Sequence, residues 1–330
     1  MSDTPSEHVP LRLRLAAKGI DGVTLLVLPL VVALILLFVY PFLYGLWLSF
    51  RPKDGSLLGN YAKFFSDPFL YETVGKTLWL AIPVTVINLV VAIPVALRVR
   101  LMRRQRVLTT ILVLPITLGT VLVAEGMLNY FGPQGWFNRV LLTALGPQGW
   151  FNGPLMDVFG PHGWFDQTLM MGPLMTAPLI SGPLKLVHNY TGVLLSLVIT
   201  GFPFTFLLVL SYLTGIDPAL EKAAATLGAG PGSRFRHIIM PLLLPGLAVT
   251  FCLGFVQAYS VFPSAVLLGA PSGPTRVISI AAYEAAFEQY DYSLASAIAM
   301  IMGVTLLLVV IAVLGARTLV YRGPAGGGKG

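Results

Sequence analysis

Six long stretches of the chain are almost entirely apolar, and the charged residues are concentrated between them. A helix needs about 20 mostly apolar residues to cross the hydrocarbon core of a bilayer. Each stretch meets that requirement, so the pattern predicts six transmembrane helices. They run from about Val23 to Phe50, Thr73 to Leu97, Leu108 to Tyr130, Gly192 to Leu213, Ile239 to Phe262 and Leu294 to Leu319.

The composition excludes a soluble protein. Of the 330 residues, 56% are hydrophobic and 11% are charged, and the mean hydropathy is +0.81. Soluble domains carry about 25% charged residues, and a chain this apolar has too little polar surface to stay in solution. The predicted fold class is therefore all-α, a polytopic membrane protein with six transmembrane helices.

Prolines lie within the predicted spans, where neighbouring helices or water can satisfy the freed carbonyls. We expect helix kinks at these positions, which are Pro83, Pro94, Pro115, Pro203 and Pro245. The first span is too long for a cleaved signal sequence, and Tyr40-Pro41-Phe42 follows it in place of the small residues of a cleavage site. It is therefore predicted to remain as a transmembrane helix.

The basic residues favour one side of the membrane. The N-terminus, the second-to-third connection, the fourth-to-fifth connection and the C-terminus hold 14 of the 21 basic residues and five of the 14 acidic residues. The positive-inside rule places these segments in the cytoplasm, which predicts a multi-pass membrane protein with both termini cytoplasmic. The same distribution explains the net charge of +7 without nucleic acid, and the run from Arg98 to Arg106 is interpreted as an anchor beside anionic membrane lipid.

The outer connection between the third and fourth spans, residues 131–191, contains a tandem repeat. Gly132-Pro-Gln-Gly-Trp-Phe-Asn138 recurs from Gly146 to Asn152 and, with changes, from Gly160 to Asp166, each time after 14 residues. Each unit predicts a turn and a short helix at the outer surface, because Trp favours the membrane–water interface. Two hypotheses remain: a local duplication tolerated in a surface loop, or a lid or docking surface for an extracytoplasmic partner.

Metal, disulfide and ATP chemistry are not expected in this chain. The single cysteine, Cys252, lies in an apolar run, and the four histidines have no metal-ligand spacing. No Gly-x-x-x-x-Gly-Lys-[Ser/Thr] phosphate loop is present. Catalytic constellations at a plausible depth are also missing from the sequence, so a membrane-embedded enzyme is disfavoured and no cofactor is expected.

The cytoplasmic connection between the fourth and fifth spans, residues 215–238, predicts a short helix followed by a glycine-rich turn. Asp217-Pro218 supplies an N-cap and a first-turn proline. The alanines that follow favour helix and let another protein surface approach closely. Gly228 and Gly230 can end the helix, and a second helix is predicted to start near Ser233 and to enter the membrane by Pro241.

This segment resembles the EAA loop of permease subunits of binding-protein-dependent ABC importers. The family pattern is roughly Glu-Ala-Ala, three variable residues and Gly, with Ile and Pro farther on. The matching residues in this chain are Ala223, Ala224, Gly228, Ile238 and Pro241. The usual glutamate position holds Lys222, and Glu221 lies one residue earlier. The resemblance therefore assigns the polar contact with the ATPase to Glu221 or to Lys222, and adds Arg234 to the expected coupling residues.

The resemblance covers nearly the whole chain, and implies a type I ABC importer (MetI-like) permease fold over residues 23–322, located in a bacterial inner membrane. Residues 1–22 would form a cytoplasmic segment and residues 323–330 a flexible tail. Asn60-Tyr61-x-x-Phe-Phe-x-Asp-Pro68 and Ala282-Tyr-Glu-Ala-Ala-Phe287 also look like this family. Within it, the chain looks most like spermidine/putrescine-type permeases and their relatives for iron, opines and similar solutes.

The resemblance also implies the partners. These are a cytoplasmic ABC ATPase dimer that binds ATP and Mg²⁺, a second permease subunit, favoured to be a different chain, and an extracytoplasmic solute-binding protein. A polyamine is the favoured solute, with ferric iron, an opine or another organic cation as alternatives. A secondary transporter or channel remains a further alternative, because it would also have six spans, although it would not explain the coupling-loop pattern.

Polar residues within the spans are candidates for the solute pathway, because such groups are costly in a bilayer. Glu125 in the third span is a candidate contact for a cationic solute. Gln257, Tyr259 and Ser260 in the fifth span are further candidates, although packing and hydrogen bonds between helices explain them as easily. Three acidic residues precede the last span, namely Glu284, Glu288 and Asp291. They could attract a cationic solute, or they could simply form a solvated surface.

Overall fold

The computed structural model describes residues 22–53, 55–146, 150–159 and 183–320, and every regular element in these ranges is helical. Six helices are long and apolar enough to cross a membrane, as predicted. Their bounds are Leu26–Ser49, Pro68–Arg100, Gln105–Leu145, Tyr190–Thr214, Pro231–Tyr259 and Tyr292–Arg317. The predicted segments 1–22 and 323–330 lie outside the described residues, apart from Gly22.

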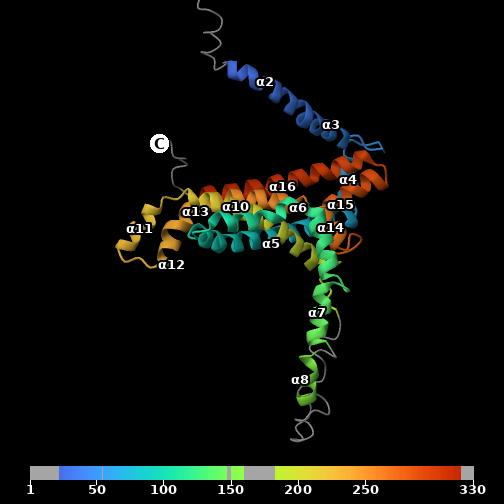
Figure 1. The fold of residues 1–330 in the computed structure, drawn as a ribbon. Coiled ribbons are helices and arrows are strands. Elements are labelled where there is room, and N and C mark those ends of the chain that lie inside the picture. Colours follow the sequence, from blue (N-terminus) through green and yellow to red (C-terminus); the bar gives the residue numbers. More distant parts are fainter. Residues whose placement is uncertain (1–21, 54, 147–149, 160–182, 321–330) are drawn as a thin grey trace, which may run out of the picture.

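Five helices lie side by side in one bundle (Figure 1). Helix α10 is the most enclosed and contacts three of the others. The five are α5 (Pro68–Arg100), α6 (Gln105–Phe131), α10 (Tyr190–Thr214), α13 (Met240–Tyr259) and α16 (Tyr292–Val320).

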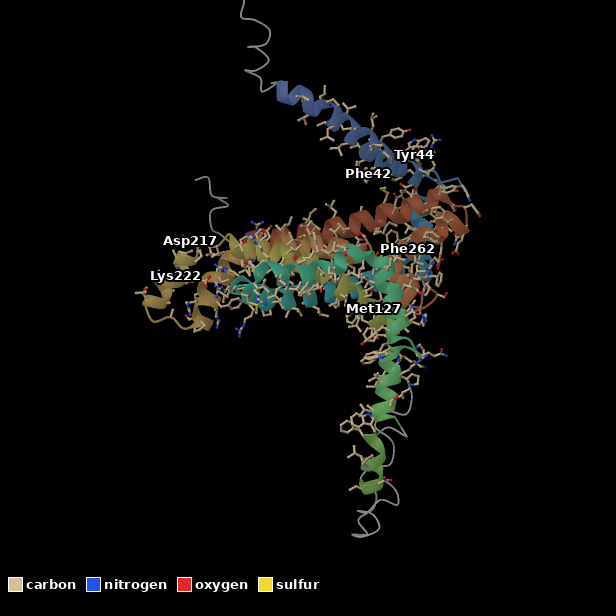
Figure 2. All side chains as sticks on the ribbon, viewed as in Figure 1. Phe42, Tyr44, Met127, Asp217, Lys222 and Phe262 are labelled. Carbon is tan, nitrogen blue, oxygen red and sulfur yellow. The ribbon has the colours of Figure 1, made fainter. Side chains whose placement is uncertain are left out.

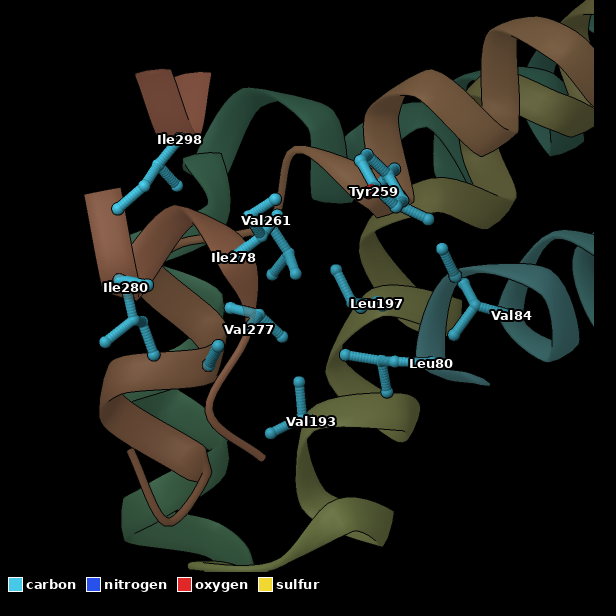
Figure 3. Close-up of a cluster of buried hydrophobic side chains, with 14 of the residues drawn as sticks. Leu80, Val84, Val193, Leu197, Tyr259, Val261, Val277, Ile278, Ile280 and Ile298 are labelled. Atoms are coloured by element: carbon cyan, nitrogen blue, oxygen red, sulfur yellow. The ribbon is translucent and has the colours of Figure 1, made fainter. Parts of the chain in front are cut away.

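The bundle core is made of aliphatic and aromatic side chains together with threonines. Leu80 of α5, Leu197 of α10 and Ile278 of α15 (Ile278–Tyr283) meet in the larger cluster (Figure 3). Buried threonine hydroxyls, such as those of Thr85 and Thr205, donate to the carbonyl one turn earlier on their own helix. Such hydroxyls can therefore be buried in a membrane interior without an unsatisfied donor.

The first span leaves the bundle at an angle (Figure 1). It consists of α2 (Gly22–Leu34), the wider π-turn η1 (Ile35–Val39) and α3 (Tyr40–Ser49), and it contacts the bundle through α3 and α16. Pro41 is the second residue after η1, and Pro241 is likewise the second residue after the π-turn η2 (Phe235–Ile239). A proline ring cannot fit against a regular preceding turn, which accounts for the widened turn at both places.

Helix α6 bends at Gly119, whose φ of 71° and ψ of 162° are not helical. The break is four residues beyond Pro115, where a kink was predicted. Beyond α6, helices α7 (Trp136–Leu145) and α8 (Asn152–Phe159) form an arm across the long axis of the bundle (Figure 1). Only a glycine adopts such a backbone conformation readily, so Gly119 permits this change of direction.

The first two repeat units each lead into a short helix, as predicted, and the third unit, residues 160–166, lies outside the described residues. In the first unit Asn138 is fully buried. Its amide donates to the carbonyls of Gly132 and Leu184 and accepts from the Leu184 N–H. This side chain thus fastens the outgoing arm to the returning chain.

Short helices close both ends of the bundle (Figure 1). Helices α11 (Pro218–Thr226) and α12 (Pro231–Arg234) lie at one end, here called the α11 end. The opposite end, the α15 end, carries α4 (Gly59–Ser66), α14 (Pro263–Leu268), α15 and the π-turn η3 (Glu284–Glu288). The fifth span, predicted to end at about Phe262, ends at Tyr259, and the short helix α14 begins at Pro263.

Asp291 caps α16 at the α15 end. Its carboxylate accepts from the Leu294 N–H (3.1 Å) and the Ser293 hydroxyl (2.9 Å). Burial alone would raise the pKa of Asp291, but these hydrogen bonds and the charges of Lys53 and Lys63 bring it below its ordinary value. The charged form is therefore favoured by folding, so its contribution is present at neutral pH and is lost as pH falls through the lowered pKa.

We expect Asp291→Ala to cost about 1 kcal/mol of stability through loss of the cap. Asp291→Asn should cost less, because asparagine also caps helices. Thermal unfolding of the purified protein from pH 7 to pH 3 measures both effects. The advantage of the wild type over Asp291→Asn should begin to shrink as the pH falls below about 4, the ordinary value for an aspartate, and should be lost only below the lowered pKa. An advantage that stays constant over the whole range would contradict the assignment.

Candidate functional site

The connection from α10 to α13 forms the short helix that the sequence predicted. Asp217 is the N-cap of α11, and its carboxylate accepts from the Ala219 N–H at 2.8 Å. Pro218 occupies the first turn, where its missing N–H costs nothing. The predicted cap is thus confirmed, and α11 stands at the extreme end of the bundle with Asp217 and Lys222 (Figure 2).

Gly228 ends α11 in a left-handed conformation with φ of 83°. The Ala229 N–H donates to the Ala224 carbonyl and the Gly228 N–H to the Ala225 carbonyl, both at 3.0 Å. This pair of bonds is a Schellman motif, which favours glycine at the left-handed position. Gly228 is therefore the residue that turns the chain back toward the membrane.

The chain re-enters the bundle through α12, which runs through η2 into α13. Gly230 is the N-cap of α12 and Pro231 its first residue, so the second helix begins two residues before the predicted Ser233. Arg234 is half-buried, and its Nε has no hydrogen-bond partner. Pro241 is exposed and is the second residue after η2.

The two charged residues of α11 lie in different environments. Glu221 is half-buried and its Oε1 lies 2.9 Å from Nη1 of Arg100, in the last turn of α5. Lys222 and Ala223 are exposed, while Ala224 is half-buried. The exposed surface of α11 is flanked by Leu220 and Leu227, which are 47% and 88% exposed.

A cavity of about 140 Å³ lies among α5, α6, α10 and α13, where these helices approach α14. Its described lining contains no charged side chain but many neutral hydrogen-bonding groups. These are Asn88, Thr120, Thr200, Thr205, Gln257, Ser260 and Ser264. Such groups can hold a hydrophilic solute or water inside an otherwise apolar bundle.

Asn88 is the lining residue that points most directly to an occupant. It is 3% exposed and its Oδ1 has no hydrogen-bond partner. Gly201 provides the space for this side chain, because a Cβ there would lie 2.7 Å from Asn88 Nδ2. An unsatisfied buried amide is costly, so a polar occupant would relieve it. Asn88 is not among the pathway residues predicted from the sequence, where its only signal is a lone asparagine within an apolar span.

The structure brings two of the four predicted pathway residues to this cavity, Gln257 and Ser260. Tyr259 instead lies fully buried in the core, as the packing alternative expected (Figure 3). Glu125 lies beyond the Gly119 bend on an exposed face of α6, where the Asn129 amide donates to it at 3.4 Å. It does not line the cavity within this chain.

A second, larger cavity of about 1280 Å³ lies among α3, α4, α5 and α16. Its lining is almost wholly apolar, and includes Phe42, Leu46, Phe65 and Leu78. It offers few polar groups to orient a hydrophilic solute, so the smaller polar cavity is the better candidate solute site.

The sequence of residues 85–322 matches the family described as the binding-protein-dependent transport system inner membrane component. The chain belongs to this family. The matched range covers well over half of the chain and includes both the α11 connection and the polar cavity. The prediction of an ABC importer permease, a multi-pass inner-membrane transport subunit rather than an enzyme, is thereby confirmed.

Curated relatives of this permease differ in their named solutes. A probable sulfate transport system permease protein of Prototheca wickerhamii is 34% identical over 129 residues, 39% of this chain and 51% of its own length. A spermidine/putrescine transport system permease protein of Haemophilus influenzae is 26% identical over 245 residues, 72% of this chain and 74% of its own length. The match thus spans only about half the length of the sulfate relative.

The permease also shares its fold with a bacterial ABC transporter involved in the import of the acidic polysaccharide alginate. The solved chain is 19% identical, with a TM-score of 0.70, and the match covers 94% of this permease and 100% of that chain. At this identity the likeness concerns the fold alone. Together with the six spans, it confirms the predicted permease fold.

Proposed function

We propose that this permease and a second permease subunit form the translocation pathway of an ATP-driven importer, and that α11 couples it to a cytoplasmic ATPase dimer. The supporting observation is α11 itself, a capped, largely exposed helix at one extreme of the bundle. One side of α11 is held to the bundle by the Arg100–Glu221 ion pair, and most of its other residues are exposed, so its small alanines leave a surface on which another protein can dock.

The charges support an orientation with the α11 end in the cytoplasm. The connection between α5 and α6 and the last turns of α5 and α16 are basic, as the positive-inside rule requires of a cytoplasmic end. The α15 end then faces an extracytoplasmic binding protein that delivers the solute. ATP and Mg²⁺ would bind on the ATPase, whose closure would shift the permeases between two states.

We propose a polyamine as the first solute to test. The likeness to the spermidine/putrescine permease extends over 72% of the chain, and in that class we expect the second permease to be a different chain. Sulfate is the second candidate, favoured by the higher identity of the sulfate permeases and by a cavity lining without acidic groups. The binding protein is expected to set the final specificity.

Uptake into liposomes tests the proposal. The permease would be reconstituted with the second permease, the ATPase and the binding protein, and labelled spermidine, sulfate and ferric iron would be compared. We expect uptake that requires both internal ATP and the external binding protein. Uptake without either component would indicate a secondary transporter instead, and sulfate uptake alone would overturn the polyamine assignment.

A further inference from the structure

The two adjacent charges of α11 point to two different functions. Successive residues of a helix are about 100° apart around its axis, so Glu221 and Lys222 point in different directions. Glu221 faces the bundle and pairs with Arg100, and their side chains are 24% and 13% exposed. Lys222 is exposed and forms no ion pair within the part of the chain that the structure describes.

Arg100 joins three elements at this point. Its Nη1 pairs with Glu221 of α11, and its Nη2 donates to the Ile216 carbonyl, just after α10, at 3.3 Å. Arg100 is the last residue of α5. The fork of the guanidinium group suits such a two-point contact, because its donors are held in a fixed plane. Helix α11 is thus fastened to the ends of α5 and α10 together.

The surroundings of the pair make Glu221 hard to replace. The pocket beside it is lined by apolar residues and by two guanidinium groups, those of Arg100 and Arg234. Glu221 is the only carboxylate among the described lining residues. Its loss would leave two partly buried cations near each other, which is more costly than the loss of an exposed ion pair.

Helix α5 continues from this contact to the polar cavity. Asn88 lies 12 residues before Arg100 on the same helix, which is about 18 Å at 1.5 Å per residue. Since a helix transmits displacement along its axis, a movement of α11 can reach the cavity through Arg100 and α5.

We propose, building on the coupling function proposed above, that Glu221 is a positioning residue that fastens α11 to α5, and that Lys222 is the charged docking contact. The partner surface must then present an acidic side chain to Lys222.

The pair can be tested within the permease by charge exchange. Arg100→Glu and Glu221→Arg should each lower the unfolding temperature of the purified chain, and the double variant Arg100→Glu/Glu221→Arg should recover most of the loss. In the reconstituted transporter the single variants should still retain the ATPase on purification, while coupled uptake falls about 5- to 150-fold, the usual range for coupling between sites. If the losses of unfolding temperature in the two single variants simply add in the double variant, the positioning role is overturned. Should Glu221→Arg fail to fold, Glu221→Gln provides a milder variant.

The docking contact is tested separately with Lys222. Lys222→Glu should lose the ATPase on purification while its unfolding temperature stays at the wild-type value, and Lys222→Arg should retain the ATPase. Unchanged retention in Lys222→Glu would overturn the docking assignment. Failure of the wild-type permease to retain any ATPase would instead refute the proposed coupling function, whereas the charge-exchange measurement on the isolated chain would still test the Arg100–Glu221 pair.

Discussion

Glu284→Ala is expected to destabilise the permease by about 3–5 kcal/mol, the cost of leaving one partner of a buried ion pair alone. The partner is Arg276, which is 2% exposed and forms an ion pair with Glu284 through Nη2. Its Nη1 donates to the Phe69 carbonyl at 2.6 Å, and the guanidinium lies 3.7 Å from the centre of the Phe69 ring. These contacts hold the Arg276 guanidinium group in place, so it cannot reach solvent when the Glu284 carboxylate is removed.

The control is Glu288→Ala, because Glu288 lies in the same π-turn but is exposed. Such a surface change should cost within about 0.5 kcal/mol. Thermal unfolding of the purified variants measures the difference. The double variant Arg276→Met/Glu284→Leu should be more stable than Glu284→Ala, because replacing both charges removes the unpaired one. Equal unfolding temperatures for Glu284→Ala and Glu288→Ala would contradict the assignment.

The consequence of this pair is a tightly connected α15 end. Arg276 joins the start of α15 to the start of α5, and the nearby Ile278 N–H donates to the Thr77 hydroxyl at 2.9 Å. Lys53 approaches Asp291 at 4.0 Å across the same end. The acidic group predicted before α16 is therefore largely used in structural contacts, since Glu284 and Asp291 both have partners within the chain. This favours the solvated or structural interpretation over attraction of a cationic solute.

The sequence predicted the spans and the α11 cap well because both depend on local signals. Span positions follow from apolar length, and the Asp217-Pro218 cap depends on residues two apart. The contact of Arg276 with Phe69 joins residues 207 positions apart, and no local pattern reports such a pairing. Likewise, Asn88 and Gln257 reach one cavity only because α5 and α13 pack together.

The predicted pathway residues show the same limit. Gln257 and Ser260 reach the cavity, but Tyr259 between them does not, because the helix turns it into the core. Glu125 lies beyond a bend that a single glycine, Gly119, introduces into α6. A regular helix through that position would have placed the carboxylate on a different side, so hydropathy alone could not assign its surroundings.

The second large effect is expected at the turn after α11. Gly228→Val should lower coupled uptake about 5- to 30-fold, which corresponds to 1–2 kcal/mol. The φ of Gly228 is 83°, a left-handed conformation that costs an L-residue about 1–2 kcal/mol. A Cβ at this position would have nothing within 4 Å, so the cost is conformational and falls on the turn between α11 and α12. The bundle itself should remain folded.

A graded series separates this backbone effect from a loss of contacts. Gly228→Asn should be mildest, because asparagine tolerates the left-handed region, Gly228→Ala intermediate and Gly228→Val most severe, because branched side chains are rare there. Gly230→Ala is the matched control: its φ is −67° and a Cβ there also has nothing within 4 Å. ATP-dependent uptake and retention of the ATPase would be measured for all four variants. Equal activity of Gly228→Val and Gly230→Ala would show that the left-handed turn is dispensable, and α11 would then need no fixed direction to couple ATP hydrolysis to transport.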